Sequence, residues 1–179
     1  MMQKRLKCMQ ELSTILIKLA GVVKESIVDG YGLRYMIFTQ GCPHKCKACH
    51  NQHTHDFNKG YWQDLDFLLK DIIKNPLLKG VTFSGGEPFL QAEKLVILAK
   101  KIKSFGLDLT IYTGFIYEEL LLMDKKSVKE LLFLADLLID GRFILEQKDL
   151  SLKFRGSSNQ RIIDTKESFK QGKIVLFEK

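Results

Sequence analysis

Three of the chain's four cysteines, Cys42, Cys46 and Cys49, lie within a stretch of eight residues. Thiolates at this Cys-x3-Cys-x2-Cys spacing predict a 4Fe-4S cluster, and a cluster with three protein ligands keeps one iron open to bind a small molecule. An electron-transfer cluster normally has four cysteine ligands. Cys8 lies far upstream in a basic leader, and we interpret it as a free thiol or an incidental residue rather than the missing ligand.

A structural zinc site is the alternative interpretation of the same loop. His44 or His50 would complete a Cys3His ligand set. Zinc sites prefer paired Cys-x2-Cys units, however, and a structural zinc gives no reason for the Gly-Gly pair that follows the next predicted strand. His53 and His55 lie in a polar loop, and we expect them at the surface rather than on a metal.

The elements that must position this loop alternate between strands and helices. Apolar and β-branched runs predict strands at 33–39, 80–84, 107–112 and 137–140, with weaker ones at 161–163 and 173–177. One-sided apolar periodicity predicts helices at 64–75, 88–106, 117–123 and from 127 onward. This alternation implies right-handed β-α-β units and a parallel sheet.

The predicted fold class is α/β with one domain. The 45% hydrophobic content suits one core, so we expect a disordered leader at 1–14 and a single domain at 15–179. The chain is shorter than the roughly 250 residues typical of a closed eight-stranded barrel. We therefore expect a partial, open (β/α) barrel of about six mostly parallel strands. A doubly wound open sheet is the alternative.

The carboxyl ends of the predicted strands carry further candidate residues, and ligands bind at this edge in parallel β/α folds. Gly85, Gly86 and Glu87 follow the second strand, Thr113 follows the third, and Asp140 ends the fourth. The glycines would let the backbone grip a zwitterionic ligand. Glu87 could bind a cofactor, or its negative charge could stabilise the N-terminus of the following helix through the helix dipole. Asp140 could bind ribose hydroxyls or be a turn residue.

The composition limits the partners. A net charge of +7 would suit an acidic protein or an anionic substrate, but no basic stripe with interleaved aromatic residues indicates nucleic acid. The sequence has no run of the roughly 18–20 apolar residues that cross a bilayer, and four cysteines are too few for a disulfide framework. We therefore expect a cytoplasmic protein that binds neither nucleic acid nor membrane.

The cysteine motif followed by Gly-Gly-Glu-Pro resembles the radical S-adenosylmethionine superfamily. Four segments, 24–30, 41–51, 139–143 and 154–161, more narrowly resemble the proteins that activate anaerobic ribonucleoside-triphosphate reductase. Superfamily members often carry an aromatic residue just before the third cysteine, where this chain has Ala48. A small residue there is compatible with the narrower family.

The resemblance implies that S-adenosylmethionine chelates the open iron of a cluster held by the three cysteines, with Ala48, His50 and Gly86 against it. An electron from a low-potential donor such as flavodoxin would break the sulfonium bond. The resulting 5′-deoxyadenosyl radical would take a hydrogen from a glycine of the reductase. With the strand-end candidates, the expected cofactor-binding residues are Ala48, Cys49, His50, Gly85, Gly86, Glu87, Thr113 and Asp140.

Arg155, Asn159 and Arg161 are the residues that we expect to help dock the partner's loop. Alternatively, this segment is an internal turn in which Ser157 and Asn159 satisfy backbone groups. Two other functions remain open: a radical enzyme that acts on another glycyl-radical partner or a small molecule, and a non-enzymatic zinc-binding module.

Overall fold

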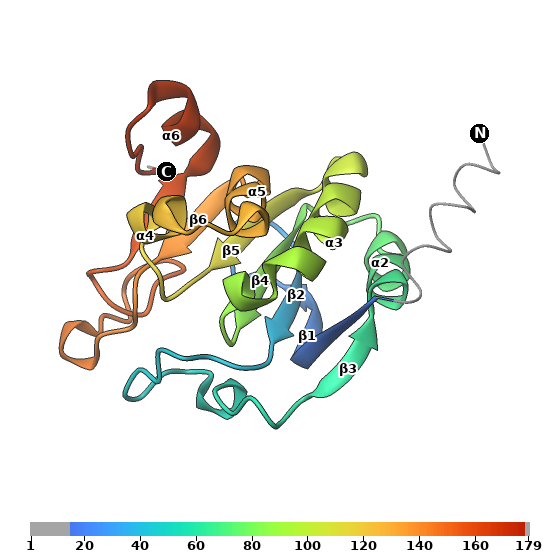
Figure 1. Cartoon of the computed structure of the whole chain (residues 1–179), viewed down its shortest axis with the longest axis horizontal. Helices are drawn as coiled ribbons and strands as arrows, with labels where there is room; N and C mark the ends of the chain where they lie inside the picture. The colour runs from blue at the N-terminus through green and yellow to red at the C-terminus, as the bar shows by residue number, and fades with distance from the viewer. Residues whose placement is uncertain (1–14, 178–179) are drawn as a thin grey trace.

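A computed structural model of the chain describes residues 15–177. Within them, seven strands form one sheet in the order β3-β1-β2-β4-β5-β6-β7 (Figure 1). The predicted leader at 1–14 lies outside the described residues. The strands are β1 (Leu16–Ser26), β2 (Arg34–Thr39), β3 (Tyr61–Asp64), β4 (Gly80–Gly85), β5 (Asp108–Tyr112), β6 (Leu137–Asp140) and β7 (Arg161–Asp164).

The middle of the sheet is parallel and its edges are antiparallel. β2, β4, β5 and β6 run parallel to one another, whereas β1, β3 and β7 join antiparallel. Among the described residues, β3 and β7 do not pair with each other, so the sheet is open. The α/β class and the open sheet are therefore confirmed, with seven strands rather than the predicted six or so.

The strands that the sequence analysis missed are β1 and β3. Side chains of β1 are buried without regular alternation, and β3 has only four residues. Both owe their conformation to pairing, since β1 pairs with β2 and β3, and β3 pairs with β1. The predicted strand at 173–177 is instead a single bridge between Leu176 and Ile163.

Two helices, α2 (Leu65–Ile73) and α6 (Thr165–Gln171), begin after aspartates whose side chains cap free N–H groups. Asp64 Oδ1 accepts from Phe67 N at 2.9 Å at the start of α2, and Asp164 caps α6 in the same way. Pro88 begins a short 3-10 helix, η2 (Pro88–Gln91), which precedes α3. The helices are α2 (Leu65–Ile73), α3 (Ala92–Ser104), α4 (Tyr117–Leu122), α5 (Lys126–Leu134) and α6 (Thr165–Gln171).

Alternate strand residues separate two faces of the sheet. One face packs its apolar side chains, such as Ile37 and Phe83, against α2, α3 and α5 to form the core; α3 and α5 lie over the sheet in Figure 1. The opposite face is buried but polar. There the Arg34 guanidinium donates to Thr82 Oγ1 at 2.5 Å and pairs with Asp108 at 2.6 Å.

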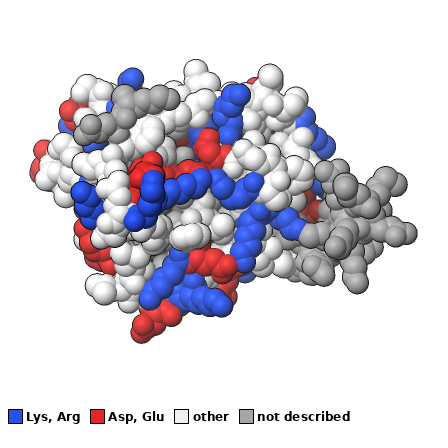
Figure 2. All heavy atoms as spheres, turned by 90° about the horizontal axis from the view of Figure 1, so that it is seen from above, with Lys and Arg blue, Asp and Glu red and all other residues white. Residues whose placement is uncertain are grey.

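The surface in Figure 2 mixes both signs of charge, with Lys and Arg side chains beside Asp and Glu side chains over much of that face. On that face, carboxylates therefore separate the positively charged side chains from one another. None of the helices within residues 15–177 combines the length and the apolar character needed to span a membrane.

Candidate active site

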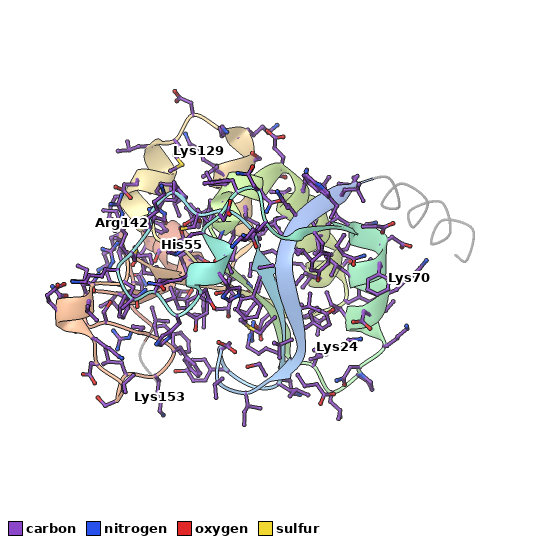
Figure 3. All side chains as sticks on the ribbon, turned by 90° about the horizontal axis from the view of Figure 1, so that it is seen from below. Lys24, His55, Lys70, Lys129, Arg142 and Lys153 are labelled. Carbon is purple, nitrogen blue, oxygen red and sulfur yellow. The ribbon has the colours of Figure 1, made fainter. Side chains whose placement is uncertain are left out.

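A cavity of about 480 Å³ opens at the carboxyl ends of the parallel strands. It lies on the polar face of the sheet, because Phe38, Ser84 and Tyr112 line it and share the face of Arg34. Two of its residues, His55 and Arg142, are labelled in Figure 3. The lining is Val28, Asp29, Phe38, Cys42, His44, Cys46, Cys49, His50, Asn51, His55, Ser84, Gly85, Gly86, Tyr112, Thr113, Gly114, Gly141, Arg142, Phe143, Leu152, Phe154, Arg155, Gly156 and Gln160.

All three clustered cysteines line this cavity. Their loop begins at Gly41, whose N–H donates to Thr54 O at 2.8 Å. Lys45 and Ala48, immediately before Cys46 and Cys49, both have left-handed backbone conformations, with φ of 49° and 57°. Such residues cost about 1–2 kcal/mol each. The loop therefore stores strain at its sharp turns, which is common at functional sites.

Burial makes two of the three thiols, those of Cys42 and Cys49, harder to ionise. Burial raises the pKa of Cys42 to about 11, although the backbone N–H groups of His44 and Lys45 oppose this shift. Burial also raises the pKa of Cys49. Metal ligation requires thiolates, so binding of a metal here would displace protons from these thiols.

The three thiols line one cavity, which suits a 4Fe-4S cluster. Within residues 15–177, no three His, Cys, Asp or Glu side chains are arranged to hold one metal ion together. A 4Fe-4S cluster takes each thiolate at a different iron, so its ligands surround a cavity. The three thiols around one cavity are therefore suitable ligands for such a cluster.

The two histidines of the zinc interpretation are placed differently. His44 is buried, with Nε2 3.0 Å from Glu87 Oε2 and its ring edge against Phe115. Its Nε2 is therefore already engaged by a carboxylate. His50 lines the cavity and its ring lies 6.1 Å from that of Phe143.

Gly85 and Gly86 line the cavity, and the chain's own packing requires both to be glycine. Gly85 has a φ of +93°, and a Cβ there would come within 2.7 Å of the Phe38 backbone. A Cβ on Gly86 would overlap the carbonyl oxygen of Gly41. The turn after β4 is thus pressed directly against the start of the cysteine loop.

Glu87 and Asp140 do not line the cavity, in contrast to their predicted cofactor-binding role. Both are buried, at 1% and 0% exposure. Asp140 follows Ile139, which pairs in register with the cavity-lining Tyr112. Asp140 therefore points to the other face of the sheet, where it accepts from Tyr117 N at 2.8 Å. Glu87 is likewise bound by protein groups.

The segment predicted to dock a partner is largely bound to the protein itself. Arg161 Nε donates to Asp140 Oδ1 at 3.0 Å, and hydrogen bonds from Arg161 lower the pKa of Glu118. Asn159 Nδ2 donates to Arg142 O at 2.9 Å. These contacts favour the internal-turn interpretation for both residues.

Arg155 and Thr113 line the cavity, whereas Ala48 is exposed and lies outside its lining. His55 was expected at the surface, but it lines the cavity, and burial lowers its pKa. Tyr112 was missed, although its position at the carboxyl end of a predicted strand could have indicated it.

The sequence pattern of the family described as "4Fe-4S single cluster domain" matches residues 28–163. The chain therefore belongs to this class of iron-sulfur proteins. The anaerobic ribonucleoside-triphosphate reductase-activating protein of Haemophilus influenzae is 38% identical over 145 residues, covering 76% of this chain and 90% of that protein. Its Vibrio cholerae counterpart is 35% identical over 144 residues, with the same coverage. The chain thus belongs to the family of anaerobic ribonucleoside-triphosphate reductase-activating proteins.

Two other proteins are similar over less of their length. A putative glycyl-radical enzyme activating enzyme of Haemophilus influenzae is 38% identical over 102 residues, which cover 55% of this chain and 39% of that protein. The solved structure of QueE from Escherichia coli superposes with a TM-score of 0.48 and 21% identity, covering 59% of this chain and 56% of QueE. That overlap is too small to assign the fold by itself.

Proposed function

We propose that this protein is an activating enzyme that cleaves S-adenosylmethionine reductively at a 4Fe-4S cluster and uses the 5′-deoxyadenosyl radical to generate a glycyl radical on anaerobic ribonucleoside-triphosphate reductase. The observation that carries the proposal is the opening of three cysteines from one loop into a single cavity at the carboxyl edge of the sheet. Membership of the activating-protein family supports it.

Cys42, Cys46 and Cys49 are the proposed cluster ligands. With three protein thiolates, the bound cluster keeps one iron for the amino and carboxylate groups of S-adenosylmethionine and supplies the electron that breaks its sulfonium bond. Gly86, His50 and Thr113 border the space in which that cofactor would lie. Ala48 is exposed, so aromatic contacts to the adenine would come from Tyr112 or Phe143, which line the cavity.

The same cavity would receive the reductase. Its apolar rim includes Val28, Leu152 and Phe154, and Val28 is 70% exposed. We interpret residues 15–179 as a single domain and the open sheet as a partial barrel. An open barrel leaves one side of the cavity free for a loop of another protein, and Arg155 is the member of the predicted docking set that remains in position to contact that loop.

The electron donor would approach from the outside of the cysteine loop. Lys45 and Lys47 are exposed there, on either side of Cys46. Their charge suits an acidic low-potential donor such as flavodoxin, because opposite charges steer protein association. We propose a cytoplasmic protein without a nucleic-acid or membrane partner.

The first experiment is turnover under anaerobic conditions. The protein is reconstituted with iron and sulfide, reduced with dithionite and mixed with S-adenosylmethionine, and 5′-deoxyadenosine is measured by chromatography. Cys46→Ala is the control for the cluster, and Lys47→Ala is a matched control in the same loop that keeps all three thiols. We expect product from the native protein and from Lys47→Ala, and none from Cys46→Ala.

A protein with a full cluster that makes no 5′-deoxyadenosine would contradict the proposal. Zinc instead of iron in the protein as isolated would support the zinc-binding module. Product formation without a glycyl radical on the reductase would favour a different partner or a small-molecule substrate.

A further inference from the structure

A buried carboxylate, Glu87, connects three loops around the cavity without lining it. Its side chain is fully buried, and it follows the Gly-Gly turn after β4. Besides Phe89 of η2, its hydrogen-bond partners come from the cysteine loop and from the loop after β5. We define the Glu87 network as Glu87, His44, Thr113 and Gly114.

The protein itself saturates this carboxylate. Oε1 accepts from Phe89 N at 3.1 Å and from Thr113 Oγ1 at 2.9 Å. Oε2 accepts from Gly114 N at 2.9 Å and lies 3.0 Å from His44 Nε2. A carboxylate offers about four acceptor sites. Glu87 therefore has no acceptor site left for a ligand, and its burial allows none to approach.

The contact between Glu87 and His44 restrains the cysteine loop, because His44 lies between Cys42 and Cys46. Its ring packs so closely on Gly114 that a Cβ at that position would overlap the imidazole. The edge of the ring also contacts Phe115, at a centroid distance of 4.6 Å. The imidazole is thus fixed on three sides, by Glu87, Gly114 and Phe115.

The backbone of Glu87 holds the other end of the same loop. Its N–H donates to the carbonyl of Gly41 at 2.8 Å, immediately before Cys42. The preceding residue, Gly86, donates to Thr39 O at 2.7 Å. The cysteine loop is therefore attached to residues 86–87 on both sides of its first cysteine.

We propose that Glu87 is a positioning residue that pre-forms the cysteine loop before any cluster is bound, and that it is not a ligand of the cofactor. It acts through His44 and through Thr113–Gly114. The network holds the loop and the neighbouring strand ends in one arrangement, so the thiols face the cavity in the metal-free protein. Assembly of a cluster then requires less ordering of the loop.

Hydrogen exchange of the metal-free protein tests this proposal. Glu87→Gln keeps the shape of the side chain. Its amide NH2 cannot accept hydrogen bonds, however, so at least one donor of the network loses its acceptor. We expect the amides of residues 42–51 to exchange about tenfold faster or more. Amides of α2 serve as an internal control and should keep their native exchange rates. A loss of stability throughout the protein would instead raise exchange in α2 as well. Glu93→Gln, which removes an exposed carboxylate on α3, is the matched control.

Two further variants keep the test decisive if Glu87→Gln does not fold. Thr113→Val keeps the volume and removes one donor, so we expect a smaller increase confined to the same amides. His44→Phe keeps the ring packing and removes the bond to Glu87, so it should approach the effect of Glu87→Gln. The electron paramagnetic resonance line shape of the reduced cluster should also change in Glu87→Gln and not in Glu93→Gln.

Native exchange rates at residues 42–51 in these variants would overturn the proposal. If Glu87→Gln also weakened binding of S-adenosylmethionine with those rates unchanged, Glu87 would be a cofactor ligand instead. The exchange measurement uses neither the cofactor nor the reductase, so its result is separate from that of the turnover experiment.

Discussion

At the scale of single residues, the site depends on close contacts between backbones. Gly86 lies against Gly41, and this contact sets the distance between the turn after β4 and the cysteine loop. The left-handed Lys45 and Ala48 then turn Cys46 and Cys49 toward the cavity. The chemistry of the thiols thus depends on neighbours that carry no reactive group.

Gly86→Ala should destabilise the protein, because its Cβ would overlap the Gly41 carbonyl. Forcing an extra methyl group into a packed region costs typically about 1–3 kcal/mol. Gly21→Ala is the matched control, since a Cβ there meets no atom within 4 Å. Urea denaturation of the metal-free variants measures both free energies of unfolding. Equal values for the two variants would show that the contact between Gly86 and Gly41 is unimportant.

The sequence predicted the chemical type of the site residues better than the face of the sheet to which each side chain points. The three cysteines, Gly86 and His50 were predicted at the site and line one cavity. Asp140 was also predicted there, but its position next to Ile139 turns it to the other face of the sheet. Strand register decides to which face the Asp140 side chain points, and register depends on contacts between segments that are distant in the sequence. The surroundings of Glu87 could not be predicted for a related reason, since its partners Thr113 and Gly114 come from another loop.

At the scale of elements, the parallel strands β2, β4, β5 and β6 were predictable from continuous apolar runs. The edge strands β1 and β3 were not, because their conformation comes from pairing rather than from a local pattern. Ion pairs then tie the elements together. Asp136, just before β6, pairs with Lys103 of α3 and Lys166 of α6.

Asp136 should make the stability of the fold depend on acid. Burial alone would raise the pKa of its carboxyl, but hydrogen bonds from Lys103 and Lys166 outweigh burial and lower it. A carboxylate with a lowered pKa stabilises the protein above its unfolded-state pKa, near 3.9, and this contribution is lost as the pH falls through the folded-state value. In Asp136→Asn, proton uptake on unfolding in this acidic range should fall by up to about one proton.

Denaturation curves between about pH 5 and pH 2 measure that uptake as the slope of the unfolding free energy against pH. Asp56→Asn, which removes a carboxylate at an exposed position, is the matched control for the loss of one negative charge. A native slope in Asp136→Asn would contradict the proposed role of this ion pair.

At the scale of the whole molecule, the core and the site are separate. The hydrophobic core comes from the strands and helices, and within the described residues it contains none of residues 40–60. We therefore expect this core to fold without a metal in the cysteine loop. This organisation differs from that of small zinc modules, which unfold without their metal.

Removal of iron with a chelator should accordingly leave the fold intact. We expect the far-ultraviolet circular dichroism spectrum to be unchanged and one cooperative thermal transition to remain, with a midpoint at most a few degrees lower. A metal-free Cys46→Ala protein should behave in the same way. Loss of cooperative unfolding on chelation would show that the metal site is part of the folding core.

The most direct test of the central claim is to detect the glycyl radical itself. The reconstituted, reduced protein and S-adenosylmethionine are mixed with the anaerobic ribonucleoside-triphosphate reductase, and the reductase is examined by electron paramagnetic resonance. We predict a glycyl radical signal that requires S-adenosylmethionine and is absent with Cys46→Ala. No signal from the reductase, although the cluster is complete and 5′-deoxyadenosine accumulates, would contradict the claim that this reductase is the substrate.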